Sequence, residues 1–312
     1  MALLRCRRDP CGVICIVLTY FSVFYADYVV VQYVLIPAYS GSVWCTLHGS
    51  VFNLILLLLL ACHAKAVFSD PGMVPLPDTA IDFSDLRSQS SRMNERGCEG
   101  WTVCSRCETY RPPRAHHCRV CQRCIRRMDH HCPWINNCVG ELNQKYFIQF
   151  LFYTGMASLY SLVLVVSAWV WRIRNEREGE AEKEGEEETP SKHLIVAHYI
   201  ILLVESVLFG VFVMVIFYDQ LVSIITDETP IEQMRNRLMI KDRSASSPSA
   251  SSPSSSSSSP LPHHTTHTRK PKLALLREVF GRGSVFCWLL PLHSSPPSVG
   301  GISYSALPDY DV

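Results

Sequence analysis

The sequence has almost no excess of charge of either sign, since 29 Lys and Arg stand against 28 Asp and Glu for a formal net charge of +1. Without a basic excess, the chain has no overall field that favours nucleic acid. A cleavable N-terminal signal is also missing, because the first hydrophobic run is too long and has no clear small-residue cleavage site. We therefore expect neither a nucleic-acid-binding nor a secreted protein.

Hydrophobic residues, in contrast, make up 48% of the chain and are clustered into long runs. A helix of about 20 apolar residues crosses the roughly 30 Å hydrocarbon core of a bilayer. We predict an α-helical polytopic membrane protein whose four transmembrane helices cover residues 12–36, 47–68, 146–171 and 194–218. Asp27 and Glu205 fall inside these spans, and each is interpreted either as a functional acid or as one hydrogen-bonded between helices.

The placement of Lys and Arg predicts how these helices are oriented. Pro37–Thr46 contains no Lys or Arg, whereas the segment after the second span is rich in arginine. The segment after the third span contains the acidic run Glu176–Glu188. By the positive-inside rule, the N-terminus (1–11), the loop 69–145 and the tail 219–312 face the cytosol, and the acidic loop 172–193 faces the lumen.

The predicted tail contains two segments of unusual composition. Residues 244–260 are Ser/Pro-rich and too polar to form a core. Leu273–Phe280 is apolar and basic, and it is a candidate for docking back onto the membrane surface. The last residues, Tyr310-Asp311-Val312, weakly match the pattern that PDZ-type domains capture at a C-terminal carboxylate.

Eight of the fourteen cysteines lie between Cys98 and Cys138, in the loop expected to be cytosolic. A reducing cytosol keeps thiols available for metal, and cysteine pairs two residues apart are typical of structural zinc sites. Two zinc ions need eight ligands, which six cysteines and two histidines supply when Cys98 and Cys132 are set aside. We predict a two-zinc cysteine-rich domain at about 98–145, between the second and third helices and folded largely by its metal.

Cys132 is left over by this ligand count, and it directly follows Asp129-His130-His131. A thiol nucleophile needs a nearby base, and the base needs an orienting partner. Alternate residues of an extended segment share a face, so His130 and Cys132 would lie together while His131 turns toward the metal. Asp129 is then the candidate that orients His130. The alternative is that Cys132 is a further ligand of a purely structural site.

These motifs resemble the DHHC protein acyltransferases, the enzymes that S-palmitoylate proteins. The similarity covers Cys104–Phe147, including Cys132-Pro133-Trp134, and extends to Asp70-Pro71-Gly72 and to the four-span topology. Lys145-Tyr146-Phe147 is similar to the Golgi-enriched branch of the family. The family's Thr-Thr-x-Glu element reads Thr229-Pro230-Ile231-Glu232 here, without its second threonine.

The resemblance implies specific roles for site residues. One structural zinc would be held by Cys104, Cys107, His117 and Cys124. The second would be held by Cys118, Cys121, His131 and Cys138. Cys132 would carry the acyl group, with His130 and Asp129 as its activating partners. A cavity for the acyl chain would be lined by Trp134, Phe147, Phe150 and Ala157, and the small Ala157 near its closed end would permit a longer chain.

The implied function is that of a protein S-palmitoyltransferase. It would move a long-chain acyl group from acyl-CoA, through an acyl-Cys132 thioester, to cysteine thiols of membrane-associated proteins. The expected location is the Golgi membrane, with the endoplasmic reticulum or plasma membrane as alternatives, and homo-oligomerisation is left open. Two other classes are a zinc-bearing scaffold, which intact Asp129, His130 and Cys132 argue against, and a zinc-finger nucleic-acid binder, which would need a soluble basic module.

Overall fold

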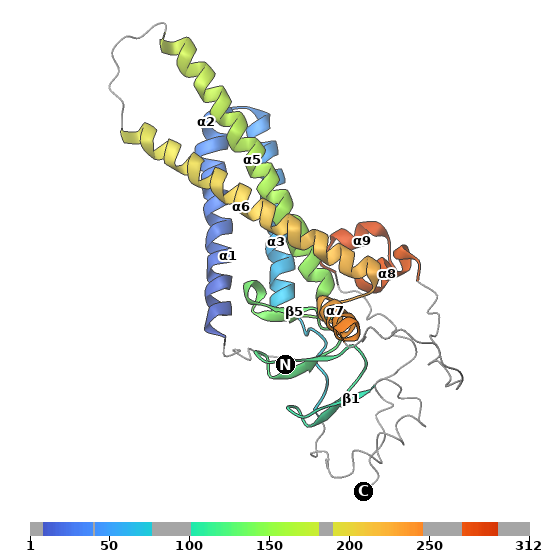
Figure 1. Cartoon of the computed structure of the whole chain (residues 1–312). Coiled ribbons are helices and arrows are strands. Elements are labelled where there is room, and N and C mark those ends of the chain that lie inside the picture. Colours follow the sequence, from blue (N-terminus) through green and yellow to red (C-terminus); the bar gives the residue numbers. More distant parts are fainter. Residues whose placement is uncertain (1–8, 40, 77–100, 181–189, 246–269, 293–312) are drawn as a thin grey trace, which may run out of the picture.

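The computed structural model describes residues 9–39, 41–76, 101–180, 190–245 and 270–292. Cys98, residues 246–260 of the Ser/Pro-rich segment, the end of the acidic run and Tyr310-Asp311-Val312 lie outside these residues. Long helices occupy one end of the molecule, and small β-hairpins occupy the other (Figure 1). This division places the cysteine-rich region below the helical bundle.

Within the described residues, four helical segments are long and apolar enough to cross a membrane, as the sequence predicts. These candidate spans are Pro10–Tyr39, Val43–Phe68, Gln144–Asn175 and His193–Thr226. The helices that contain them are α1 (Pro10–Val29) with its continuation η1 (Val30–Leu35) and α2 (Ile36–Tyr39), α3 (Val43–Phe68), α5 (Gln144–Glu180) and α6 (Pro190–Thr226). The cysteine-rich region lies between the second and third of these spans, as predicted.

The segment 172–193, predicted as an acidic loop, is partly helical. Helix α5 continues beyond Trp171 to Glu180, and α6 already begins at Pro190. The charged residues of this segment mark the end of the apolar run, but Glu, Arg and Lys are also strong helix formers. The helices therefore extend past the boundaries that hydropathy alone would set.

The first span changes its hydrogen-bonding pattern at η1, a π-helical segment. Pro37 follows this segment and has no backbone N–H to donate to a carbonyl oxygen of the preceding turn. The Tyr199 hydroxyl of α6 donates to the carbonyl oxygen of Tyr33 in this segment, at 2.7 Å. A carbonyl that would be costly to leave unpaired in lipid is thereby satisfied, and the first and fourth spans are linked.

The cysteine-rich region consists of three antiparallel β-hairpins in the described part of the chain. The strands are β1 (Thr102–Cys104) with β2 (Thr109–Arg111), β3 (His116–Cys118) with β4 (Arg123–Ile125), and β5 (His130–Cys132) with β6 (Asn137–Val139). A short 3-10 turn, η3 (Pro133–Ile135), connects β5 to β6. Strands this short cannot form a hydrophobic core, which agrees with a region folded around metal.

Asn137 joins the third hairpin to the membrane-spanning bundle. Its Nδ2 donates to the carbonyl oxygens of Ala66, Val67 and Ser69, at 3.0, 3.2 and 2.9 Å. These are acceptors at the C-terminus of α3, where a helix leaves its last carbonyls without partners. Asn137 is fully buried and therefore fixes β6, and with it β5, at the end of a membrane helix.

Close backbone packing holds the hairpins on the other side. A Cβ atom built on Gly140 would lie 2.4 Å from the carbonyl oxygen of Pro71, so only glycine fits there. A Cβ on Gly12, near the start of α1, would lie 2.4 Å from Oδ1 of Asn136. The third hairpin is thus clamped between the N-terminus of α1 and the segment that follows α3.

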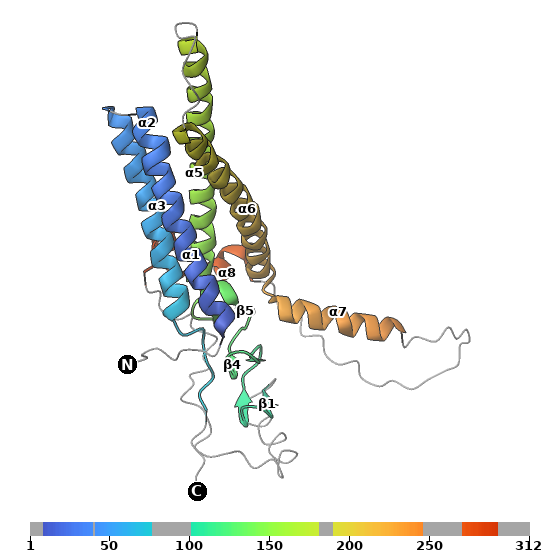
Figure 2. The same ribbon diagram turned by 90° about the vertical axis from the view of Figure 1, so that its left-hand side faces the viewer.

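In the described part of the tail, three further helices follow the fourth span. Helix α7 (Pro230–Ala245) projects sideways from the molecule, whereas α8 (Lys272–Phe280) returns to the bundle (Figure 2). Leu275 of α8 is buried against Ile148 of α5 and Ile224 of α6. The segment Leu273–Phe280, predicted to dock onto the membrane surface, is a helix that packs on the ends of the third and fourth spans.

Helix α9 (Val285–Leu289) is held to α5 through its own backbone and that of the residues after it. Gln149 donates to the carbonyl oxygens of Trp288 and Leu290, at 2.6 and 2.8 Å. The Tyr153 hydroxyl donates to the carbonyl oxygen of Leu289 at 2.7 Å. Lys145, one turn before Gln149, reaches two further carbonyl oxygens. One face of α5 therefore binds the backbone of the C-terminal segment.

Candidate active site and metal centres

The first group of candidate metal ligands is built on the hairpin β3–β4. His117 and Cys124 are direct partners in this hairpin, so their side chains project from the same face. Cys104 and Cys107, around the turn of the first hairpin, complete the group. His117 Nδ1 lies 3.6 Å from Cys104 Sγ, 3.1 Å from Cys107 Sγ and 3.9 Å from Cys124 Sγ. The structure thus brings together the four residues that the resemblance implied.

The second group repeats this arrangement on the hairpin β5–β6. His131 and Cys138 are direct partners, and Cys118 and Cys121 approach them from the preceding hairpin. His131 Nδ1 lies 3.4 Å from Cys121 Sγ and 3.7 Å from Cys138 Sγ. The two cysteine sulfurs lie 3.4 Å apart. These are the other four implied residues, and they tie the second hairpin to the third.

Both groups have the geometry of a tetrahedral zinc site. In each group the four ligand atoms all lie within 4.8 Å of one another. Ligands bonded to one zinc at about 2.0–2.3 Å would be roughly 3.5–3.8 Å apart, close to the separations found here. Hydrogen bonds from Cys121 and Cys138 also lower the pKa of the Cys118 thiol well below its usual value, which favours the thiolate that binds metal.

Asp9 supports the second group from outside. His131 turns Nδ1 toward the cysteines, and its Nε2 lies 3.3 Å from Oδ2 of Asp9. A carboxylate that accepts from Nε2–H fixes the tautomer in which Nδ1 is free to bind metal. Asp9 also caps α1 by accepting from the amide of Cys11 at 3.1 Å. The start of the first span is therefore tied to the metal centre.

The other face of β5 carries the candidate catalytic residues. This strand has the extended conformation that the sequence analysis assumed, so His130 and Cys132 alternate with His131. Nδ1 of His130 lies 2.5 Å from Oδ2 of Asp129, which is 2% exposed. The ring nitrogen left over is available to Cys132. A carboxylate, an imidazole and a thiol are thereby brought into one chain of contacts.

The electrostatics of His130 follow from these neighbours. Burial of the ring lowers its pKa, but the hydrogen bonds with Asp129 and Cys132 outweigh that effect and raise the pKa to about 9. Phe147 lies edge-to-face against the ring, with centroids 5.4 Å apart, and limits its movement. The site therefore favours an imidazole that holds a proton close to the thiol.

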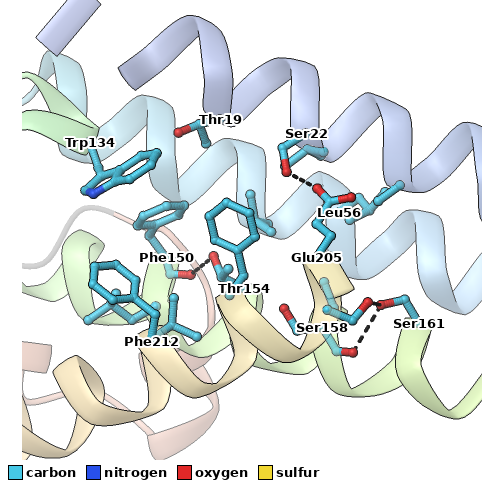
Figure 3. Close-up of a pocket in the computed structure, with 18 of the residues that line it drawn as sticks. Thr19, Ser22, Leu56, Trp134, Phe150, Thr154, Ser158, Ser161, Glu205 and Phe212 are labelled. Atoms are coloured by element: carbon cyan, nitrogen blue, oxygen red, sulfur yellow. Dashed lines mark hydrogen bonds between the residues drawn. The ribbon is translucent and has the colours of Figure 1, made fainter. Parts of the chain in front are cut away.

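Cys132 opens onto a cavity between the membrane-spanning helices. The lining includes all four predicted residues, Trp134, Phe147, Phe150 and Ala157, and apolar side chains of α3 and α6. Trp134 stands at one end of the cavity and packs against Phe209 and Phe212 of α6 (Figure 3). The thiol thus lines a space that suits a hydrocarbon chain.

The opposite end of this cavity is polar. Ser22 of α1 donates a hydrogen bond to Oε1 of Glu205 on α6 (Figure 3). Nearby, the hydroxyls of Ser161 and Ser206 are 2.8 Å apart and link α5 to α6. Glu205 was interpreted either as a functional acid or as an acid hydrogen-bonded between helices, and the structure contains that interhelical hydrogen bond. Both residues lie in the cavity lining, and their bond joins α1 to α6 across it.

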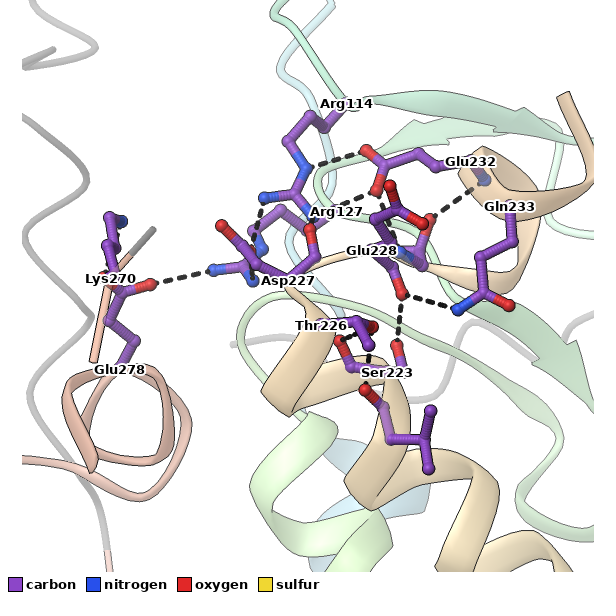
Figure 4. A network of polar contacts seen from close by, with 12 residues as sticks. Arg114, Arg127, Ser223, Thr226, Asp227, Glu228, Glu232, Gln233, Lys270 and Glu278 are labelled. Atoms are coloured by element: carbon purple, nitrogen blue, oxygen red, sulfur yellow. Dashed lines mark hydrogen bonds and ion pairs between the residues drawn. The ribbon is translucent and has the colours of Figure 1, made fainter. Parts of the chain in front are cut away.

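An ionic network fastens the cysteine-rich region to the end of the fourth span. Arg114 pairs with Asp227 at 2.8 Å and with Glu232 at 2.7 Å, and Arg127 also pairs with Asp227 (Figure 4). Glu232 accepts from the amide of Thr229 at 2.8 Å, while Thr229 Oγ1 accepts from the amide of Glu232. This is a capping box that starts α7, with Pro230 at its first helical position. A second threonine is not needed for it.

Sequence reasoning did not find several residues that support the site. Gln220 of α6 donates to Oδ2 of Asp129 at 2.8 Å, and Asp9 contacts His131. Each lies about 90 or more positions from its partner, so no local spacing links them. Their only sequence signal is a polar side chain at the very end of an apolar run.

Comparisons with known proteins agree with this geometry. The family model described as DHHC palmitoyltransferase matches residues 98–237. The chain is 40% identical over 229 residues to palmitoyltransferase ZDHHC3 of Homo sapiens, covering 73% of this chain and 72% of that protein. It is 36% identical over 230 residues to palmitoyltransferase ZDHHC7 of Rattus norvegicus, covering 73% and 70%. It is 42% identical over 130 residues to probable protein S-acyltransferase 14 of Arabidopsis thaliana, covering 37% and 41%.

Proposed function

The chain belongs to the DHHC palmitoyltransferase family, and from that premise we propose that Cys132 is its acyl-carrying nucleophile, with His130 as base and Asp129 as the residue that orients His130. The activity of the chain is protein S-palmitoylation. The observation that carries the residue assignment is the position of Cys132. It faces His130 and the cavity, while the eight neighbouring ligands gather in two metal groups.

The first step loads the enzyme. The Cys132 thiol gives its proton to His130, and the thiolate attacks the carbonyl carbon of a long-chain acyl-CoA thioester. A bond forms between Cys132 Sγ and the acyl carbon, the carbon–sulfur bond to CoA breaks, and the CoA thiolate takes the proton from His130. The products are an acyl-Cys132 thioester and free CoA.

The second step transfers the chain to a protein. The thiol of a cysteine in a membrane-associated substrate gives its proton to His130 and attacks the acyl-Cys132 carbonyl. The acyl group moves to the substrate sulfur, and the Cys132 thiolate is released and recovers the proton. Because one thioester replaces another, the enzyme must supply mainly positioning and thiolate activation.

The cavity and the metals have separate tasks in this proposal. The cavity lining of Trp134, Phe147, Phe150 and Ala157 keeps the acyl chain out of water, at a gain of about 0.8 kcal/mol per buried methylene. Two structural Zn²⁺ ions on the two ligand groups would hold the hairpins in place and take no part in the chemistry. Cys132 remains outside both groups and stays reactive.

The surroundings of the enzyme are proposed from its sequence. The arginine-rich loop supports a cytosolic cysteine-rich region, with both ends of the chain on that side. The similarity of Lys145-Tyr146-Phe147 to the Golgi-enriched branch supports the Golgi membrane as location. Acyl-CoA and substrate proteins would then both reach Cys132 from the cytosol.

A labelled-acyl assay tests the assignment. Purified protein is incubated with radiolabelled palmitoyl-CoA, then treated with hydroxylamine, which cleaves thioesters. Wild type should carry a hydroxylamine-labile label and pass it to a cysteine-containing membrane protein, whereas Cys132→Ser should do neither and should still bind two zinc ions. Labile label on Cys132→Ser, or loss of both zinc ions from it, would falsify the division of labour.

The same assay separates the enzyme from a zinc-bearing scaffold. A scaffold would bind its client proteins without forming any acyl-enzyme. Wild-type protein that binds two zinc ions and remains unlabelled at saturating palmitoyl-CoA would favour the scaffold over the proposed role of Cys132.

A further inference from the structure

Asp129 receives a second hydrogen bond from a residue outside its own hairpin. Its Oδ2 accepts from His130 Nδ1 at 2.5 Å and from Gln220 Nε2 at 2.8 Å. Gln220 lies in the last two turns of α6, 91 positions away, and is 3% exposed. Burying an amide is costly unless it is hydrogen-bonded, and the buried amide of Gln220 is bonded to the carboxylate proposed to orient His130.

The orientation of the Gln220 amide is dictated by its partners. An ionised carboxylate only accepts hydrogen bonds, so the nitrogen of Gln220 must face Asp129. Oε1 of Gln220 then faces Nε2 of Gln144, the first residue of α5, at 3.4 Å. The amide is therefore held at both ends, between the start of the third span and the catalytic hairpin.

The second donor matters because the Asp129 carboxylate could otherwise turn about its terminal bond. Its Oδ1 is buried and has no hydrogen-bond partner among the described residues. Two donors on Oδ2, from His130 and Gln220, define the plane of the carboxylate and keep Oδ2, not Oδ1, against the imidazole. Loss of the Gln220 donor would leave His130 as the only side chain, of those the structure describes, that is bonded to that group.

We propose that Gln220 is a positioning residue for acyl transfer, which acts by fixing the Asp129 carboxylate so that His130 keeps one ring nitrogen on Asp129 and the other toward Cys132. This inference rests on the proposed roles of Asp129, His130 and Cys132. It extends the site to α6, one of the helices that line the acyl cavity. Gln220 itself is not among the residues that line the cavity.

The test compares two variants of Gln220 with a matched control in the full-length protein. Gln220→Leu removes the amide, and Gln220→Glu keeps its size but replaces the donor by an acceptor. Gln149→Leu is the control, because Gln149 is also 3% exposed and donates through Nε2, but to backbone carbonyls of the C-terminal segment. Acyl-enzyme formation from palmitoyl-CoA is followed as CoA release over a range of substrate concentrations.

We expect both Gln220 variants to lower kcat for acyl-enzyme formation by about 10–100-fold, the range found for residues that orient metal-binding side chains through a hydrogen bond, with KM within twofold of wild type. Gln149→Leu should keep both constants within twofold. Bound zinc should stay at two ions per chain in all three proteins. A kcat within twofold of wild type in Gln220→Glu, or a loss confined to KM, would overturn the inference.

A double variant decides whether Gln220 acts through Asp129. In the Asp129→Ala background, where acylation is followed over hours, adding Gln220→Leu should cause less than a twofold further loss. An equal fold-loss in both backgrounds would show that Gln220 acts by another route. Cys132→Ser is assayed in parallel: retained labile label there would refute the proposed function, whereas an inactive Cys132→Ser with normal Gln220 variants would refute only the inference.

Discussion

Arg114 holds Glu232 by two parallel hydrogen bonds, from Nε to Oε1 at 2.7 Å and from Nη2 to Oε2 at 3.0 Å. The pair connects the cysteine-rich region to the capping box of α7, across 118 positions of the chain. A planar guanidinium makes this fork, and a lysine ammonium does not. The relative position of the two parts should therefore depend on arginine in particular.

Arg114→Lys should destabilise the protein by about 1.5–3 kcal/mol, the usual contribution of hydrogen bonds to charged groups. The measurement is the midpoint of thermal unfolding, followed by size-exclusion chromatography after heating. Arg111→Lys is the control, because Arg111 is half-buried like Arg114 but its Nε donates to a neutral group, the hydroxyl of Thr102, at 2.7 Å. Equal midpoints for the two variants would remove the fork as a stabilising contact.

The same pair predicts a pH dependence of stability. Burial raises the pKa of Glu232, but the hydrogen bond with Arg114 outweighs it, and the pKa lies below its ordinary value of 4.5. A carboxyl whose folded pKa is depressed stabilises the fold above the unfolded pKa, and this stability is lost as the pH falls through the folded pKa. Glu232→Gln should therefore be less stable than wild type at pH 6–7, and the gap in unfolding midpoint should narrow below about pH 4.5. A gap that is constant from pH 7 to pH 4 would contradict this.

Removing one ligand from each metal group should have unequal effects on activity. Cys121→Ser weakens the group that holds β5, the strand of His130 and Cys132, whereas Cys107→Ser weakens the group on the first two hairpins. We expect bound zinc, measured by mass spectrometry, to fall from two to about one per chain in both variants. Acyl-enzyme formation should be lost in Cys121→Ser and only reduced in Cys107→Ser. Full activity of Cys121→Ser would separate the second group from the active site.

The acyl cavity should become shorter when Ala157 is enlarged. Ala157→Tyr places a ring in the lining, so chains longer by about two methylenes lose roughly 1.6 kcal/mol of burial, or about tenfold in preference. The measurement is competition between C14 and C18 acyl-CoA for acyl-enzyme formation. Met156→Tyr is the control, because Met156 is 39% exposed on the outer face of the same helix. An unchanged ratio in Ala157→Tyr would remove Ala157 from the chain-contacting surface.

At the polar end of the cavity, removing a side chain should lengthen the space for the acyl chain, the opposite of the effect of Ala157→Tyr. Glu205→Ala removes the partner of Ser22 and leaves space between α1 and α6, so the C18 chain should gain relative to C14. Glu205→Gln keeps the size and the hydrogen bond and should retain the wild-type ratio. If Glu205→Ala also retains the wild-type ratio, the hydrogen-bonded side chain of Glu205 does not set the length of the chain.

The sequence predicted the sorting of cysteines and histidines because that sorting is local. The two-residue period of a strand decides which side chains share a face, so the separation of His131 from His130 and Cys132 could be foreseen, whereas the division of the eight ligands into two groups was implied only by the family resemblance. The contacts Asp9–His131, Gln220–Asp129 and Arg114–Glu232 could not, because each depends on how helices pack against the hairpins. The extension of α5 to Glu180 was missed because charged residues end an apolar run without ending a helix.

The mode of attachment of α9 sets few requirements on its own side chains. Gln149 and Tyr153 donate hydrogen bonds to backbone carbonyl oxygens, which every amino acid provides. The side chain of Phe286 in α9 is 81% exposed. The exposed residues of α9 can therefore be substituted while the hydrogen bonds from α5 to its backbone are kept. A C-terminal segment bound in this way gives the enzyme a surface whose side chains can change, for example to contact other substrate proteins. Its attachment to α5 does not depend on those side chains.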